Sequence, residues 1–204
     1  DFDPQNPVWQ AYLAGLEGGL EWTCAFYQQR AADLPSRQPP ANAFGCFSYA
    51  VWPENRVRLH FRNACPQGVS PLSAAQMPAR LEELRALFSG LRSQGGDPAF
   101  VIGGSWLYNL PAYRRLFPPG YLASARPSYE DFPYIALWGQ FLDRDGQVRP
   151  DQAALFRRNL AAAATLQQAK EALPFPLLRL EGPIQEFYRF YAIIPSRPSS
   201  AGGT

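Results

Sequence analysis

The sequence is poor in the side chains that most catalytic and metal sites use. Its 204 residues include one histidine, three cysteines and one methionine, and no CxxC pair occurs. A single histidine excludes an HExxH metalloprotease site and any zinc site of the usual ligand spacing. The chain also lacks the GxxxxGK[ST] and GxGxxG patterns, which excludes a P-loop and a dinucleotide-binding loop. We therefore expect neither a metal nor a cofactor.

Long apolar runs and a surplus of one charge are missing as well. No apolar run approaches the roughly 18 residues of a membrane span, so we expect no membrane association. The 19 basic and 17 acidic groups give a net charge of +2, whereas nucleic-acid-binding domains usually carry a concentrated basic face. Nucleic acid is therefore not the expected partner. Lys170 is the single lysine among the basic residues, and this use of arginine is typical of a GC-rich bacterial genome.

The three cysteines follow no disulfide or metal pattern. Cys24, Cys46 and Cys65 are an odd number, at spacings of 22 and 19 residues. We interpret them as small buried hydrophobic residues in a reducing cytoplasm. The alternative is one reactive thiol, for which Cys65 is the candidate. No signal-peptide pattern is visible, and the sequence therefore predicts a cytoplasmic protein.

Hydrophobic residues make up 47% of the chain and charged residues 18%, which is the composition of a folded protein. Apolar positions recur at helical spacing over residues 4–16 and 20–33. A proline-rich connector follows at residues 35–42. The sequence therefore predicts three parts: a helical arm at 1–34, a main domain at 43–194 and a flexible tail at 195–204.

The main domain combines strand and helix patterns. Two aromatic and β-branched segments, 44–51 and 56–63, flank a turn and predict a hairpin. A helix is predicted at 78–92, followed by a strand at 98–103 that is buried on both faces. The further predicted elements are a helix at 111–117, a strand at 134–142, a long helix at 150–173, a strand at 177–180 and a helix at 183–191. This order predicts an α/β or α+β fold with a mixed sheet of about four to six strands flanked by helices.

Two clusters of residues are candidates for a site. In the second hairpin strand Arg58, His60 and Arg62 point to the face opposite the apolar residues, and Asn63 follows. Such a face is typical of an edge strand that shows its polar side to water. The alternative is a pocket in which the two arginines hold an anion while His60, as the catalytic candidate, handles a proton.

The second cluster directly follows the predicted strand at 98–103. Its candidate ligand-binding residues are Ser105, Trp106, Tyr108 and Arg114. A Gly-Gly-Ser loop at the carboxyl end of a strand exposes backbone N–H groups, and ligands of α/β sheets bind at such ends. The competing interpretation is a tight turn with aromatic residues in the core.

The two clusters form one crevice if their strands are parallel neighbours. We therefore expect an anionic small molecule to bind between the 56–63 strand and the 103–109 loop, although the residues define no reaction. The alternative function is a non-catalytic protein–protein interaction, or assembly into a homo-oligomer, through the aromatic-rich residues 1–34. An arm with one apolar face has to bury that face on its own domain or on a partner.

Overall fold

The chain divides into two compact units in the computed structural model, Asp1–Pro39 and Pro40–Thr204. The predicted connector lies outside the described residues except for Asn42, and the predicted tail lies outside them altogether. The structure describes residues 3–33, 42–66, 68–94, 98–129, 135–143 and 146–193.

The first unit consists of the predicted N-terminal helices, joined by a 3₁₀ turn: α1 (Pro7–Gly15), η1 (Leu16–Gly18) and α2 (Gly19–Asp33). The Asn6 side chain caps α1 by accepting a hydrogen bond from the Val8 N–H at 2.9 Å. Gly19 has a φ of +66°, a left-handed conformation that favours glycine at the start of the second helix. Four rings hold the two helices together, with Tyr12 lying 6.0 Å from Trp22 and 5.8 Å from Phe26, and Trp9 5.6 Å from Tyr12.

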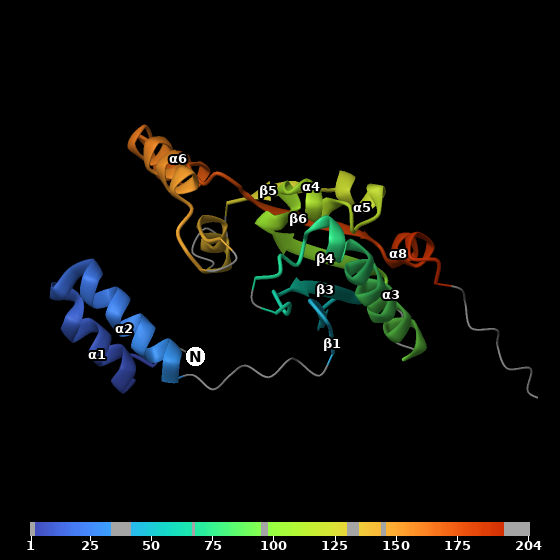
Figure 1. Ribbon diagram of the computed structural model, residues 1–204, viewed down its shortest axis with the longest axis horizontal. Helices are drawn as coiled ribbons and strands as arrows, with labels where there is room; N and C mark the ends of the chain where they lie inside the picture. Colours follow the sequence, from blue (N-terminus) through green and yellow to red (C-terminus); the bar gives the residue numbers. More distant parts are fainter. Residues whose placement is uncertain are drawn as a thin grey trace, which may run out of the picture. The chain divides into compact units, whose positions relative to one another are not determined.

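The second unit is built on a six-stranded sheet in the order β1-β2-β3-β4-β6-β5. Only β3 and β4 are parallel to each other, and the other neighbours are antiparallel. This arrangement confirms the predicted mixed sheet flanked by helices (Figure 1). The strands are β1 (Ala43–Phe44), β2 (Phe47–Trp52), β3 (Arg56–Phe61), β4 (Phe100–Ser105), β5 (Arg126–Ser128) and β6 (Leu177–Pro183).

Helices and 3₁₀ segments connect these strands. The crossover between the parallel pair runs through α3, the longest helix among the described residues, because parallel neighbours need such a connection. The segments are η2 (Ala74–Gln76), α3 (Met77–Ser93), η3 (Trp106–Asn109), α4 (Pro111–Arg114), α5 (Pro119–Ala123), η4 (Ile135–Phe141), α6 (Pro150–Ala161), α7 (Leu166–Glu171) and α8 (Ile184–Phe190).

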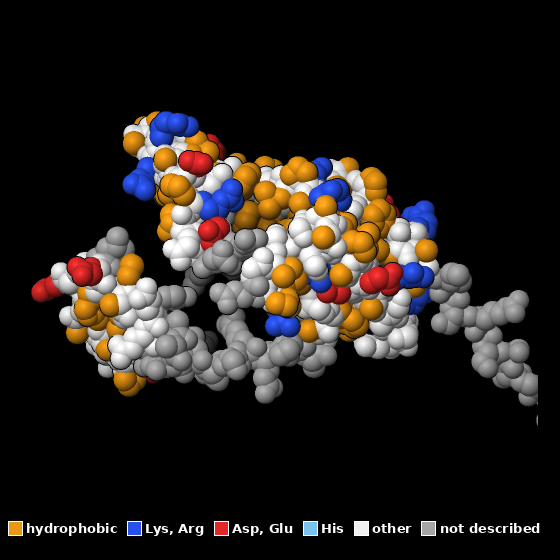
Figure 2. Space-filling view, in the orientation of Figure 1, with side chains coloured by type: hydrophobic (Ala, Val, Ile, Leu, Met, Phe, Trp, Pro, Cys, Tyr) orange, Lys and Arg blue, Asp and Glu red, His pale blue; other side chains and the backbone are white. Residues whose placement is uncertain are grey.

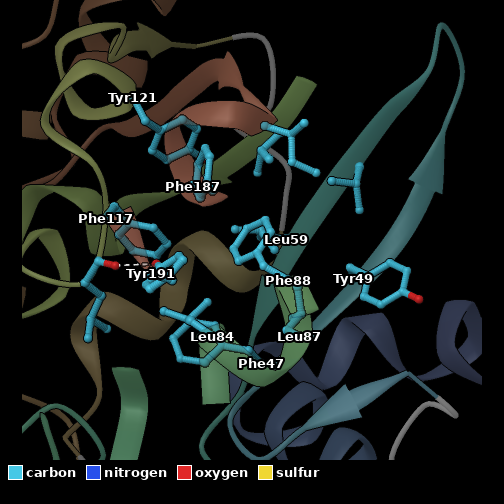
Figure 3. Close-up of a cluster of buried hydrophobic side chains, with 14 of the residues drawn as sticks. Phe47, Tyr49, Leu59, Leu84, Leu87, Phe88, Phe117, Tyr121, Phe187 and Tyr191 are labelled. Carbon is cyan, nitrogen blue, oxygen red and sulfur yellow. Dashed lines mark hydrogen bonds between the residues drawn. The ribbon is translucent and has the colours of Figure 1, made fainter. Parts of the chain in front are cut away.

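The main core lies on one face of the sheet. Alternation along β3 turns Val57 and Leu59 toward this face, where α3, α4, α5 and α8 pack. Phe88 of α3 and Phe187 of α8 meet here with ring centroids 4.8 Å apart (Figure 3). The buried Tyr191 hydroxyl donates a 2.5 Å hydrogen bond to the carbonyl of Leu116. Burying one large apolar side chain of this core, such as Phe88, contributes about 1.5–3 kcal/mol to the free energy of unfolding.

A smaller core covers part of the other face. Leu137 of η4, Leu173 and Leu177 of β6 form this second cluster. Gln140 is completely buried there. Its side-chain amide donates to the carbonyls of Leu137 and Phe175, while its oxygen accepts from the Phe175 N–H at 2.8 Å. One amide therefore satisfies several backbone groups that join η4 to the segment before β6.

Two predicted elements after residue 130 are wrong in type or length. Residues 135–141 form the 3₁₀ segment η4 rather than a strand, while residue 134 lies outside the described residues. The apolar run is typical of a strand, but its rings pack against α6 in a tertiary contact that no local pattern reveals. The predicted long helix is divided into two separate helices, α6 and α7, because Thr165 and Gln168 form a capping box that starts a new helix.

The predicted burial of the 98–103 strand on both faces is also wrong. Val101 of β4 is fully buried, but Phe100 remains 40% exposed. The reason is that β4 is parallel to β3 alone, and its second face lines a cavity instead of a helix layer.

None of the described helices is long and apolar enough to cross a membrane. On the face of the second unit drawn in Figure 2, basic and acidic side chains are interspersed among hydrophobic ones. This distribution matches the nearly balanced charge of the chain.

Candidate functional site

The candidate site begins with the polar face of β3. Since side chains alternate along a strand, Arg56, Arg58 and His60 point away from the core to which Val57 and Leu59 belong. The strand register continues this face across the sheet, where Arg58 is opposite Ile102 of β4, and Ile102 is opposite Glu181 of β6. Strand β5 adds Arg126, the register partner of Arg179.

A cavity of about 910 Å³ lies on this polar face. Its sheet residues come from β3, β4, β5 and β6, and α7 contributes Gln167 and Lys170. Trp52, at the end of β2, completes the lining on the side of β3. The basic lining residues are Arg56, Arg58, Arg126, Lys170 and Arg179, and Glu181 is the one carboxylate among the described lining residues.

The charges in this cavity are only partly neutralised. Arg56 binds Glu54 at 2.9 Å and Glu181 at 3.3 Å. The Arg58 guanidinium lies 5.1 Å above the centroid of the Trp52 ring, a cation–π contact that leaves its charge in place. Within the described part of the chain, no carboxylate forms an ion pair with Arg58, Arg126 or Lys170.

The parallel ladder between β3 and β4 is short. It joins Arg56–Arg58 to Phe100–Ile102, while the strands continue to Phe61 and Ser105. Beyond the ladder, the backbone of Gly103 and Gly104 lines the cavity. A Cβ added to Gly104 would lie 3.8 Å from Nη2 of Arg58, so this guanidinium reaches over the glycine backbone. Because a Cβ at Gly104 would point to the cavity, its absence lets a ligand approach the backbone closely.

His60 lies on the same face of β3 but does not belong to the described lining of the cavity. Its side chain is exposed, and its register partner on β2 is Ser48. Partial burial and the positive charge of Arg58 lower the pKa of His60 below its ordinary value of 6.5. His60 is therefore predominantly neutral at physiological pH.

The other residues predicted after β3 lie outside the described lining. Arg62 and Asn63 are exposed, and the Asn63 side chain accepts a hydrogen bond from the Cys65 N–H at 3.1 Å. Arg114 is exposed at the end of α4. Of the predicted ligand residues, the structure brings Arg58 to the cavity.

The residues predicted after β4 have local roles. The Ser105 hydroxyl accepts from the Leu107 N–H at 3.1 Å and so caps η3. The Trp106 indole donates to the carbonyl of Ala136 at 3.1 Å. Tyr108 is 1% exposed, and its hydroxyl lies 2.9 Å from the hydroxyl of Tyr121, beneath Gly103 and within the core.

Sequence reasoning missed four of the cavity's cations, Arg56, Arg126, Lys170 and Arg179. Arg56 lies in the predicted hairpin strand, on the same face as Arg58. For Arg179 a signal exists, because it alternates with Leu178 and Leu180 in β6 and must face away from the core. Arg126 occurs in a three-residue strand without an apolar pattern, and Lys170 lies on α7, which the sequence predicts as the end of one long helix.

No protein-family model, curated protein or solved structure matches this chain. The geometry of the cavity therefore carries the functional argument.

Proposed function

We propose that the second unit binds a small molecule with at least two anionic groups in the cavity on the polar face of the sheet. The observation that carries the proposal is the lining, in which four arginines and one lysine face one carboxylate among the described residues. The whole chain has a net charge of only +2. The positive charge is thus gathered at this place and is not a property of the surface as a whole.

The chemistry of the cations favours phosphate or carboxylate groups. A guanidinium presents a planar fork that holds such a group through two hydrogen bonds. The cations come from separate elements, Arg58 from β3, Arg126 from β5, Arg179 from β6 and Lys170 from α7. This spread fits an extended ligand with separated charges, and 910 Å³ is within the range of about 300–1,000 Å³ for small-molecule sites.

The proposal concerns binding and names no reaction. Glu181, the carboxylate of the described lining, is held by Arg56 at 3.3 Å. We therefore assign Glu181 to holding Arg56 in place and not to proton transfer. The hydroxyl of Ser124, another lining residue, donates to the carbonyl of Tyr121 and accepts from the Glu181 N–H.

A thermal-shift titration tests the proposal. The panel contains inorganic pyrophosphate, inorganic triphosphate, di- and tricarboxylates, nucleotides and acyl carriers. A compound at 100 times its dissociation constant adds about 2.7 kcal/mol to the free energy of unfolding, which raises the melting temperature visibly. We expect polyanions to bind and their affinity to fall with added salt.

Four variants identify the site. Arg58→Gln and Arg179→Gln are each expected to weaken binding by about tenfold or more, the effect of losing one charge-assisted hydrogen bond. Arg157→Gln, on the exposed side of α6, is the matched control and is expected to bind normally. Binding that survives the first two changes but is lost in Arg62→Gln would move the site to the end of β3. No stabilisation by any polyanion would refute the proposal.

A second candidate function, binding of a protein partner, is favoured by the first unit. None of the described residues of α1 is buried. Val8 and Leu13 of α1 and Leu16 of η1 are 38%, 40% and 43% exposed, and exposed apolar side chains close together in a short segment are typical of contact surfaces. If the arm mediates self-assembly, the molar mass of the full chain measured by light scattering exceeds that of one chain, and Leu13→Ser restores a monomer. A monomeric full chain would exclude self-assembly.

A further inference from the structure

A second cluster of reactive groups lies at the start of α3, in the main core. Arg80 is 5% exposed, and its Nη1 atom donates to the sulfur atoms of both Cys46 and Cys65, at 2.9 and 3.1 Å. Its Nη2 atom binds Glu83 at 2.5 Å. The cysteines come from the turn between β1 and β2 and from the segment after β3.

The geometry brings the two sulfur atoms close together. Because both accept from the same nitrogen, their separation cannot exceed the sum of the two hydrogen-bond lengths. The backbone holds both segments in place. The Cys46 N–H donates to Glu83 at 3.0 Å, and the Cys46 carbonyl accepts from the Arg62 N–H at 2.9 Å. The thiols are therefore positioned as a pair.

A buried guanidinium also changes the chemistry of its sulfur partners. A neutral thiol is a weak hydrogen-bond acceptor, whereas a thiolate is negatively charged and is the reactive nucleophile. The Arg80 guanidinium places a positive charge and a hydrogen-bond donor against both sulfurs. Cys46 is 1% exposed, and burial raises the pKa of its thiol. Cys65 is only partly buried, so a reagent from solvent meets Cys65 first.

We propose that Cys46 and Cys65 form an oxidisable thiol pair whose substrate is a hydroperoxide. The Cys65 thiolate attacks one peroxide oxygen and the O–O bond breaks. The leaving oxygen takes a proton and departs as water or alcohol, and Cys65 becomes a sulfenic acid, oxidised by two electrons. The Cys46 sulfur then attacks the Cys65 sulfur, the S–O bond breaks, and the hydroxyl leaves as water with the thiol proton of Cys46.

Peptide mapping of the peroxide-treated full chain tests this pair. Trypsin places the three cysteines in separate peptides, Cys24 in residues 1–30, Cys46 in 38–56 and Cys65 in 63–80. The reduced protein is exposed to hydrogen peroxide, its remaining thiols are alkylated, and the digest is analysed by mass spectrometry. We expect the 38–56 and 63–80 peptides to be joined with the loss of two hydrogen atoms, while Cys24 is alkylated.

Variants separate the proposed order of events from general thiol oxidation. Cys46→Ser is expected to stop at the Cys65 sulfenic acid. Dimedone should trap this sulfenic acid about tenfold faster than any formed at the exposed Cys24, because Arg80 donates a hydrogen bond to the Cys65 sulfur, whereas none of the described residues donates one to Cys24. Cys24→Ser is the matched control and is expected to form the linked peptides at the wild-type rate. Circular dichroism confirms that each variant is folded.

Two outcomes would overturn the inference. In the first, Cys46 and Cys65 remain alkylatable in the folded wild-type protein while Cys24 is oxidised. In the second, Cys65 of the folded Cys46→Ser variant reacts with peroxide no faster than Cys24. Either result would show that Arg80 and the two sulfurs only pack together and that the thiol pair is not reactive.

Discussion

Gly103 and Gly104 are consecutive residues of β4 that face opposite sides of the sheet, and alanine should destabilise the protein at the first position but not appreciably at the second. A Cβ at Gly103 would lie 2.2 Å from the Tyr121 hydroxyl and 2.4 Å from the Tyr108 hydroxyl. Both tyrosines are at most 1% exposed and their hydroxyls are hydrogen-bonded to each other, so neither side chain can move into solvent. A Cβ at Gly104 would meet Nη2 of Arg58 at 3.8 Å, an ordinary contact with a flexible side chain.

We expect Gly103→Ala to lower the free energy of unfolding by about 3 kcal/mol, the upper end for an added methyl group in a packed core. For a domain of this size, this corresponds to a fall in melting temperature of roughly 6–12 °C. Gly104→Ala is expected to change the stability by less than about 1 kcal/mol, because the alanine also reduces the entropy of the unfolded chain. Urea titrations with a common m-value measure both differences.

A double-mutant cycle tests the cause. If the hydroxyl of Tyr121 is the obstacle, Gly103→Ala combined with Tyr121→Phe should cost at least about 1 kcal/mol less than the two single changes added together. Equal costs for the two glycine variants, or strict additivity in the cycle, would refute the reasoning from the close approach of these tyrosines.

Two further predictions concern the side chains of His60 and Gln140. The pKa of His60 is lowered by burial and by Arg58, so the folded chain binds this proton more weakly than the unfolded chain. The stability contributed by neutral His60 is complete above pH 6.5 and is lost as the pH falls through the folded pKa. An NMR titration of this single imidazole should show a midpoint below 6.5 that rises in Arg58→Gln, and a wild-type midpoint at or above 6.5 would contradict this. Gln140→Leu removes the partners of Phe175 and Leu137 and should cost about 2–4 kcal/mol in a urea titration, whereas a loss below about 1 kcal/mol would show that water replaces the amide.

The parts of the fold that sequence predicted correctly are those with a local cause. The alternation of Arg58 and His60 with Val57 and Leu59 determined the two faces of β3. The apolar spacing of α3 and its proline in the first turn marked that helix within one residue at each end. Both signals belong to neighbouring residues and survive folding because the tertiary contacts agree with them.

The cavity was only partly predictable, because its cations meet through contacts between distant segments. Arg58 was a candidate, but its companions Arg179 and Lys170 lie more than a hundred residues later in the chain. Tyr108 was considered a ligand residue, yet its hydroxyl is bonded to Tyr121 in the core. A tyrosine after a Gly-Gly-Ser segment gives the same sequence pattern whether its side chain binds a ligand or packs in the core. Only the tertiary packing distinguishes the two.

The pairing of β5 with β6 has a consequence for how this protein can vary. Ser128 and Leu177 are register partners, so residues 129–176 leave the sheet and return to it at adjacent points. In topological terms, η4, α6 and α7 are therefore the connecting loop of a β-hairpin. The cost of closing such a loop grows only slowly with its length, and its ends are held by the sheet whatever lies between them. A connecting segment of different length or shape would change the side of the cavity that carries Lys170. The arginines on the strands would stay in place. Variation in this segment could therefore change which ligand the same sheet binds.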